Sequence, residues 1–227
     1  MHIPDGFLSP EVAAGAGVVA VAAVGYGLRR AGRELDDRTV PLLGVTAAFI
    51  FAAQMLNFPV AGGTSGHLLG AALAAVLLGP WLACLVLAVV LITQAFLFAD
   101  GGITALGANI LNMGVVGALC VGALIAALRH VTSGRGAFLA VVGGGAWLAV
   151  MAGAVVTSVE LAMSGTVPLA PALAAMLGVH ALIGIGEAVI TVAAVSAVLA
   201  SRPDLVALRP PGPERPTGSR RPAAEAV

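Results

Sequence analysis

Long stretches without a charged residue constrain the fold of this chain more than any other feature of its sequence. Residues 66–98 contain no Asp, Glu, Lys or Arg, although a single membrane-spanning helix needs only about 20 apolar residues. Across all 227 residues, 59% are hydrophobic and 10% are charged, whereas a soluble domain carries about 25% charged residues. The chain lacks the polar residues that a water-facing surface requires, so it is predicted to be an integral membrane protein.

Seven apolar segments separate at charged residues, prolines and glycine clusters, which predicts an all-α, polytopic membrane protein with seven transmembrane helices. The stretch 66–98 is too long for one span. It divides at Gly79-Pro80, because proline lacks an amide hydrogen and fixes its own backbone angle. The expected spans are residues 10–28, 40–58, two spans within 66–98, 104–128, 137–163 and 172–200.

The arginines test this division of the chain independently. With seven spans and the amino terminus outside, every arginine falls in a connection or tail on the cytoplasmic side, as the positive-inside bias requires. Six spans would place arginines on both sides, and an inverted chain would place them outside. The residues concerned are Arg29, Arg30, Arg33, Arg38, Arg129, Arg135, Arg202, Arg209, Arg215, Arg220 and Arg221. We therefore expect the carboxyl terminus in the cytoplasm.

The two ends of the chain differ in character. His2 and Asp5 precede the first apolar segment, where a secretory signal peptide would have a positive region, so the opening residues are expected to persist in the mature protein. Residues 201–227 hold six of the thirteen prolines and no periodic apolar face. We expect a seven-helix transmembrane domain over residues 1–200 and a disordered Arg- and Pro-rich cytoplasmic tail over residues 201–227.

Composition excludes several classes of function. The formal net charge is zero, whereas nucleic-acid-binding proteins show a basic excess, so no nucleic-acid partner is expected. Cys84 and Cys120 lie inside apolar runs, which predicts neither a disulfide framework nor a zinc cluster. All eleven basic residues are arginines, so the chain has no Walker-type Gly-Lys sequence for binding ATP.

Polar groups at membrane depth are costly, which makes the few present in this chain candidate functional groups. They gather at residues 1–8, 54–67 and 100–112, and at His180 with Glu187. The last two are seven residues apart, close to two helical turns, and therefore share one helix face. We expect Glu187 to pair with His180 or to join a structural network. A proton-coupled transporter using both residues is an alternative.

The Met1-His2 start is a ready-made chelator for a transition metal. The amino group and the ionised amide of His2 close a five-membered ring on a metal, and that amide with the nearer imidazole nitrogen closes a six-membered ring. Three coplanar nitrogens leave one corner of a square for another donor, and His67 is the candidate. A square of nitrogens suits Ni(II) or Cu(II), and less readily Co(II). From the residues alone, an exposed terminal His2 and a hydrogen-bonded His67 at a helix start remain open.

Other polar residues have simpler interpretations. Asn109 and Asn112 either join helices through side-chain hydrogen bonds or contact a ligand. Asp5 and Glu11 are expected to be ordinary charges of the outer face, and Glu160 is expected at the outer membrane interface.

Four strings on this topology closely resemble the CbiM/NikM family, the substrate-binding (S) component of nickel and cobalt energy-coupling-factor (ECF) transporters. Four separate motifs make the resemblance highly specific, and it covers essentially residues 1–200. The strings are MHIPDGFLSP at 1–10, AAQMLNFPVAGGTSGHLLG at 52–70, DGGITALGANILNMG at 100–114 and HALIGIGEAVIT at 180–191.

The resemblance implies a protein of the cell membrane that binds one Ni(II) or Co(II) ion, its transported substrate, at an amino terminus folded back into the bundle. The family's ligands carry over as the amine of Met1, the amide and imidazole nitrogens of His2, and His67. No organic cofactor is expected, and nickel and cobalt are not distinguished. Ser65, Thr104 and Asn109 are expected to orient the imidazoles.

The resemblance also implies partners. Members of the family work with a transmembrane coupling (T) subunit, two cytoplasmic ATPase subunits and often a small two-span accessory subunit. The Arg- and Pro-rich tail of this chain has no counterpart in the family pattern.

An intramembrane serine hydrolase is the alternative from a different class of protein. Residues 63–66 look like a nucleophile turn around Ser65, with His67 or His180 as the base. A nucleophile and its base must meet within hydrogen-bond distance, and Ser65 and His67 are too close in sequence for an obvious productive geometry. This alternative also leaves the Met1-His2 start unexplained.

Overall fold

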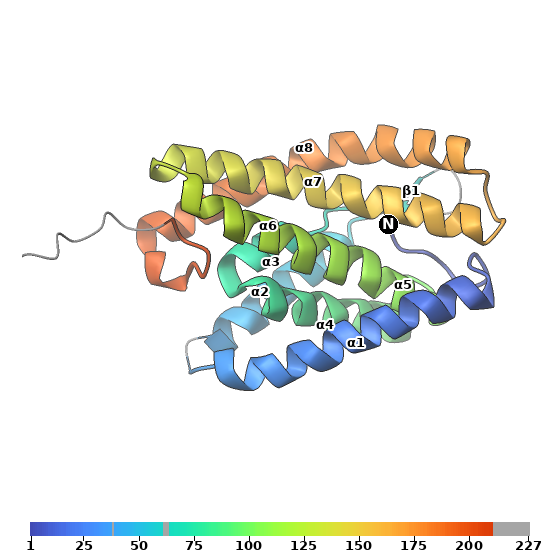
Figure 1. The fold of residues 1–227 in the computed structure, drawn as a ribbon, viewed down its shortest axis with the longest axis horizontal. Helices are drawn as coiled ribbons and strands as arrows, with labels where there is room; N and C mark the ends of the chain where they lie inside the picture. The colour runs from blue at the N-terminus through green and yellow to red at the C-terminus, as the bar shows by residue number, and fades with distance from the viewer. Residues whose placement is uncertain (38, 61–63, 211–227) are drawn as a thin grey trace, which may run out of the picture.

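Helices make up nearly all of the regular structure in the computed structural model, which describes residues 1–37, 39–60 and 64–210 (Figure 1). Among the described residues, five helices are long and apolar enough to cross a membrane, and a sixth apolar helix is shorter. The five are α1 (Pro10–Glu34), α4 (Pro80–Phe98), a continuous helix over Leu106–Val131, α7 (Gly134–Met163) and α8 (Leu169–Ser201), and the sixth is α2 (Thr39–Gln54). The all-α, multi-pass fold class is confirmed.

The helix Leu106–Val131 changes its winding along its length. It consists of α5 (Leu106–Asn109), a π-helical stretch (Ile110–Cys120), α6 (Val121–Leu128) and a final 3₁₀ turn (Arg129–Val131). The apolar sequence predicted a span here but carries no signal for the change of winding. π-Helical turns inside α-helices are often found at functional sites.

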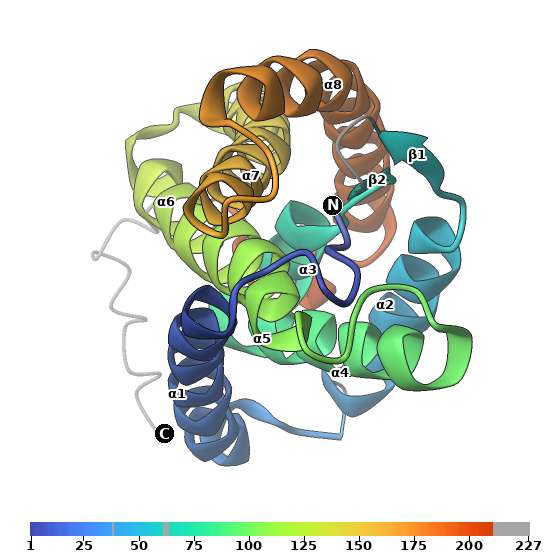
Figure 2. The same ribbon diagram turned by 90° about the vertical axis from the view of Figure 1, so that its right-hand side faces the viewer.

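The expected third span differs most from its sequence-based prediction. Only α3 (Ala71–Leu78) is helical there, preceded by a two-stranded antiparallel hairpin of β1 (Phe58–Val60) and β2 (Thr64–Gly66), in which Phe58 pairs with Gly66. Eight helical residues reach about 12 Å, too short to cross a bilayer. All eight are buried, and α3 lies in the middle of the bundle (Figure 2). Non-helical backbone is tolerated at membrane depth where protein surrounds it.

The ends of the helices agree with the predicted distribution of arginines. The carboxyl end of α1, the connection between α6 and α7, and the carboxyl end of α8 lie at the same end of the bundle (Figure 1). These places carry Arg29, Arg30, Arg33, Arg129, Arg135, Arg202 and Arg209. Arg38, Arg215, Arg220 and Arg221 lie outside the described residues.

The beginning of the expected tail is folded. We call residues 203–209 the C-terminal strap: after a 3₁₀ turn (Pro203–Leu205), it runs back along the end of α3. The amides of Ala207 and Leu208 donate to the carbonyls of Leu77 and Val76, at 3.2 and 3.0 Å. The last carbonyls of a helix have no partner within it, and the strap supplies one. The predicted disorder therefore does not begin at Ser201, and residues 211–227 lie outside the described residues.

Candidate metal site

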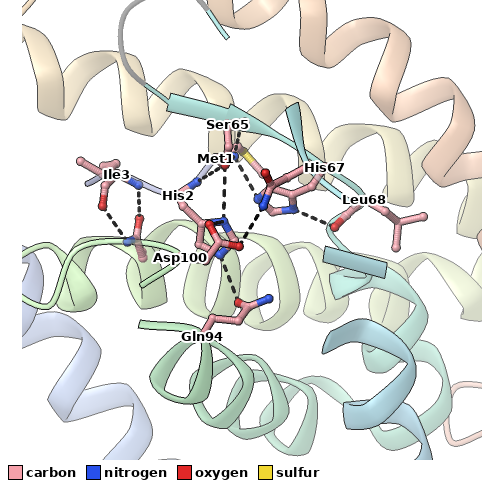
Figure 3. Close-up of polar contacts among 10 residues, drawn as sticks. Met1, His2, Ile3, Ser65, His67, Leu68, Gln94 and Asp100 are labelled. Carbon is pink, nitrogen blue, oxygen red and sulfur yellow. Dashed lines mark hydrogen bonds and ion pairs between the residues drawn. The ribbon is translucent and has the colours of Figure 1, made fainter. Parts of the chain in front are cut away.

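The amino-terminal segment enters the bundle and ends at its centre (Figures 1 and 3). Met1 and Ile3 are fully buried, and His2 is 4% exposed. The expectation that the amino terminus folds back into the bundle is confirmed. Its amine and first amide thus lie in the low-dielectric interior rather than in water.

Side chains from the α4–α5 region anchor this segment. Asn109 brackets Ile3: its Oδ1 accepts from the Ile3 amide at 2.8 Å, and its Nδ2 donates to the Ile3 carbonyl at 3.1 Å. The carboxylate of Asp5 accepts from both the amide and the hydroxyl of Thr104, at 2.7 and 2.5 Å. A Cβ added at Gly102 would lie 2.3 Å from the Asp5 nitrogen, so the close approach of these two backbones requires glycine. Asn109 and Thr104 hold the segment rather than the imidazoles.

Four nitrogens gather where the segment ends. The Met1 amine lies 3.0 Å from Nε2 of His67 and donates to the Ser65 carbonyl. The His2 amide donates to Oγ of Ser65 at 3.2 Å, and Nδ1 of His2 lies 3.4 Å from the same oxygen. The rings of His2 and His67 stack with centroids 4.5 Å apart (Figure 3). The structure brings together Met1, His2, His67 and Ser65 from the expected site.

Carbonyl acceptors fix which imidazole nitrogens carry hydrogen. Nε2 of His2 lies 3.1 Å from Oε1 of Gln94, and Nδ1 of His67 lies 2.9 Å from the Leu68 carbonyl. A carbonyl oxygen only accepts, so both of these nitrogens donate. The lone pairs of the rings are therefore on Nδ1 of His2 and Nε2 of His67. These are the two nitrogens that the chelate requires.

Two neighbours of His2 had no assigned role in the sequence. Gln94 is fully buried, and Asp100 places Oδ1 3.4 Å from Nδ1 of His2 while its Oδ2 accepts from Asn57 at 2.9 Å. Gln94 is the only amide side chain in the stretch 66–98. A single amide at membrane depth marks a candidate functional residue, and this feature of the sequence could have identified Gln94. Asp100 stood in a recognised motif without a role.

Burial makes the chelating groups available to a metal. Burial lowers the pKa of the Met1 amine from 8.0 to about 4, although the nearby Asp100 carboxylate acts against this shift. Burial, together with the neighbouring amine, lowers the pKa of His2 to about 3, with the Gln94 hydrogen bond opposing. Both groups are therefore neutral at pH 7. Metal ligands must be deprotonated, and these two need lose no proton.

Glu187 and His180 are bonded to different partners. The carboxylate of Glu187 accepts from the amides of Leu69 and Gly70, at 2.7 and 2.6 Å. Nδ1 of His180 lies 2.8 Å from the Met176 carbonyl. Among the hydrogen bonds of the described residues, none joins His180 to Glu187. Glu187 instead fixes the backbone that follows His67 and begins α3.

Asn112 and Glu160 form a second buried polar cluster. Nδ2 of Asn112 donates to Oε2 of Glu160 at 2.6 Å and to Oγ1 of Thr157 at 3.1 Å. Asn112 thus joins the π-helical stretch to α7. Glu160 was expected at the membrane interface, but it is only 5% exposed, because this side-chain amide compensates for its burial.

The geometry offers little to a serine hydrolase. Oγ of Ser65 accepts from the His2 amide and lies 3.3 Å from the Met1 amine. His67, one expected base, uses its two ring nitrogens on the Met1 amine and the Leu68 carbonyl. Ser65 is placed to orient the amino terminus rather than to be activated as a nucleophile.

Metal-binding side chains alone would not reveal this site. Among the described residues, no three His, Cys, Asp or Glu side chains lie close enough to hold a metal ion. The candidate donors are two imidazoles and two main-chain nitrogens. With bonds of about 2.0–2.1 Å between a metal and nitrogen, adjacent corners of a square lie about 2.9 Å apart. The 3.0 Å between the Met1 amine and His67 Nε2 fits that separation.

The chain is similar to known metal transport proteins. The chain is 37% identical to the fused nickel transport protein NikMN of Rhodobacter capsulatus, over 95% of this chain and 67% of that protein. It is also 37% identical to cobalt transport protein CbiM 1 of Pelobacter propionicus, over 88% of this chain and 91% of the relative. A crystal structure of a truncated transition metal transporter superposes with a TM-score of 0.81 and 35% identity, covering 88% of this chain and 99% of that one.

The family assignment rests on most of the chain. The family model CbiM, described as a cobalt uptake substrate-specific transmembrane region, matches residues 2–205. That range contains all the described elements from α1 to α8 and every residue of the candidate site except Met1. The chain therefore belongs to the CbiM family of nickel and cobalt transport proteins, multi-pass proteins of the cell membrane.

Proposed function

We propose that this protein captures Ni(II) or Co(II) from outside the cell and serves as the substrate-specific component of an ATP-driven, energy-coupling-factor transporter. One observation carries the proposal: the Met1 amine, the His2 amide and Nδ1 of His2 lie within 3.4 Å of Ser65 Oγ, Nε2 of His67 lies 3.0 Å from the amine, and the outer hydrogen bonds leave no hydrogen on either of these imidazole nitrogens. The named relatives transport nickel or cobalt. A square of nitrogens favours nickel, but this donor set serves either ion.

The ion is the transported substrate, and the residues of the chain supply its ligands. The Met1 amine, the ionised His2 amide and Nδ1 of His2 take three corners of a square, and Nε2 of His67 takes the fourth. Ser65 orients the amine and the amide, while Gln94 and the Leu68 carbonyl hold the two rings. Losing the amide proton removes one of the ion's two charges, which lowers the cost of holding it in the bundle.

Energy for uptake comes from separate subunits in this proposal. The family resemblance implies a transmembrane coupling subunit, two cytoplasmic ATPase subunits and often a small two-span accessory subunit. ATP-driven movement of these partners would open the buried site toward the cytoplasm. This chain itself binds only the ion in the proposal and needs no organic cofactor.

The experiment compares nickel binding by protein with an untouched amino terminus and by a variant carrying one extra residue before Met1. Purified through a carboxyl-terminal tag, the first should retain one nickel per chain. The extended variant should fold equally well but lose high-affinity binding, because its Met1 nitrogen becomes a secondary amide. His67→Ala should also weaken binding strongly in a calorimetric titration. Equal nickel retention by both proteins would refute the chelate.

A further inference from the structure

Asp100 is a carboxylate that links the buried ligands to the surface. The side chain of His2 is 3% exposed, whereas that of Asp100 is 16% exposed, and the two meet at 3.4 Å between Nδ1 and Oδ1. Met1 and His67 are 0% and 2% exposed. Asp100 is therefore more exposed than any of the proposed ligands.

The backbone builds Asp100 into this position. Helix α4 ends at Phe98, the next residue, Ala99, adopts a left-handed conformation with φ of 53°, and Gly101 has φ of 90°. The Asp100 amide donates back to the Gln94 carbonyl at 3.1 Å. A Cβ at Gly101 would lie 3.3 Å from Cδ2 of His2, so this turn packs directly on the ligand ring. The left-handed conformation is unfavourable for alanine, yet Ala99 adopts it in this turn.

The charges of a loaded site explain why a carboxylate belongs there. A divalent ion held by one ionised amide and three neutral nitrogens leaves a net charge of +1. An uncompensated charge in the bundle is expensive, and Asp100 supplies the opposite charge without displacing a nitrogen. The other buried carboxylates nearby are bonded elsewhere, because Glu187 accepts from Leu69 and Gly70 and Glu160 accepts from Asn112.

We propose that Asp100 receives the hydrated ion at the outer surface, passes it to Nδ1 of His2 and then balances the charge of the bound complex. This inference rests on the proposed function. Asn57 donates a hydrogen bond to Oδ2 of Asp100, which leaves Oδ1 of Asp100 directed at His2 (Figure 3). Asp100 is thus a positioning and access residue, outside the square of nitrogens.

The test measures the association rate of Ni²⁺ with the full chain by stopped-flow absorbance, over a range of ionic strength. Asp100→Asn should lower the rate constant about tenfold or more and flatten its dependence on salt, because a local opposite charge steers the ion. Asp100→Glu should retain most of the rate. Glu11→Gln removes the same charge from an exposed position in the first turn of α1 and should change the rate less than twofold.

Wild-type rate and affinity in Asp100→Asn would overturn the inference, as would an equal loss in Glu11→Gln. If Asp100→Asn does not fold, the salt dependence of the wild-type association rate constant tests the inference instead. A wild-type rate constant that does not change with ionic strength excludes a steering carboxylate. Nickel binding by the wild-type chain separates the two proposals. If the wild-type chain does not bind nickel, the proposed function is wrong. If the wild-type chain binds nickel and Asp100→Asn binds it with the same rate constant and affinity, only the role of Asp100 is wrong.

Discussion

At the scale of single residues, the candidate site depends on which nitrogen of each histidine carries hydrogen. Gln94 accepts from Nε2 of His2, and the Leu68 carbonyl accepts from Nδ1 of His67. These two bonds leave the opposite nitrogens free for an ion. Partners of this kind orient a metal ligand and set its tautomer. Gln94 is a side chain and can be replaced, whereas the Leu68 carbonyl is main chain and cannot.

Replacing Gln94 by Leu should therefore weaken nickel binding by about 10- to 100-fold, the usual effect of removing such a partner. His2 would lose the acceptor that holds hydrogen on Nε2, and its ring could place hydrogen on the ligating nitrogen instead. Calorimetric titration measures the change. Thr93→Val is the matched control, because the Thr93 hydroxyl bonds only within its own helix, to the Val89 carbonyl. Equal affinities for the two variants would mean that Gln94 does not set the tautomer.

Proton release on nickel binding should distinguish a buried amine from an exposed one. Burial lowers the pKa of the Met1 amine to about 4 and that of His2 to about 3, so both are already neutral at pH 6–8. Only the His2 amide then releases a proton. We expect about one proton per ion over this range, and a further loss of affinity once the pH falls through about 4 and the amine protonates.

Calorimetry in buffers of different ionisation enthalpy counts these protons. An amine in water has a pKa of about 8 and would add most of a second proton at pH 7. A count near two would show that the amine is solvated before the ion binds, contrary to the buried segment in the structure.

At the scale of elements, α3 and the backbone before it illustrate what the sequence could and could not predict. The apolar run identified a segment at membrane depth, and the Gly-Thr-Ser-Gly-His string marked its ligand. The same run could not show that only Ala71–Leu78 is helical, because hydropathy measures composition and not how many other helices surround a segment. The turn at Gly70, with φ of 74°, and its bond to Glu187 set the start of the helix.

The site itself divides in the same way. Met1, His2 and His67 were predictable, since they stand in motifs whose spacing carries the chemistry. Gln94 was not, because one amide in an apolar run has no spacing and acquires its role only when the amino terminus folds against α4.

Glu187→Ala tests whether the hydrogen bonds from Leu69 and Gly70 to Glu187 position the start of α3. The change would leave the buried amides of Leu69 and Gly70 without an acceptor, and each unsatisfied amide costs about 1–3 kcal/mol. We expect a lower melting temperature together with weaker nickel binding, because the backbone after His67 loses its anchor. Glu160→Gln is the control: Gln can still accept from Asn112, and the hydrogen bonds of this pair join the π-helical stretch to α7 rather than to α3, so nickel affinity should not change. A destabilised Glu187→Ala with unchanged nickel affinity would show that the anchor does not position His67.

At the scale of the whole molecule, α3 connects the candidate site to the arginine-bearing end of the bundle. Glu187 holds its beginning, next to His67, and the C-terminal strap holds its end through Leu77 and Val76. Arg129 at the end of the long central helix also donates to the strap, at the carbonyls of Ala207 and Arg209. The strap is therefore part of the folded bundle rather than the first residues of a free tail.

Truncation should show how much the strap contributes. Ending the chain after Arg202 removes the two backbone hydrogen bonds from the strap to α3, worth about 0.5–1.5 kcal/mol each, and the burial of Val206 and Leu208, which are 2% and 6% exposed. Allowing for partial burial in the unfolded chain, we expect a loss of roughly 3–5 kcal/mol, or about 10 °C in melting temperature for a protein of this size. Ending the chain after Pro210 keeps the strap and removes only the segment predicted to be disordered, so its melting temperature should match that of the full chain. Equal melting temperatures for the two truncated proteins would mean that the carbonyls at the end of α3 find other partners, and that the strap is not needed to hold it.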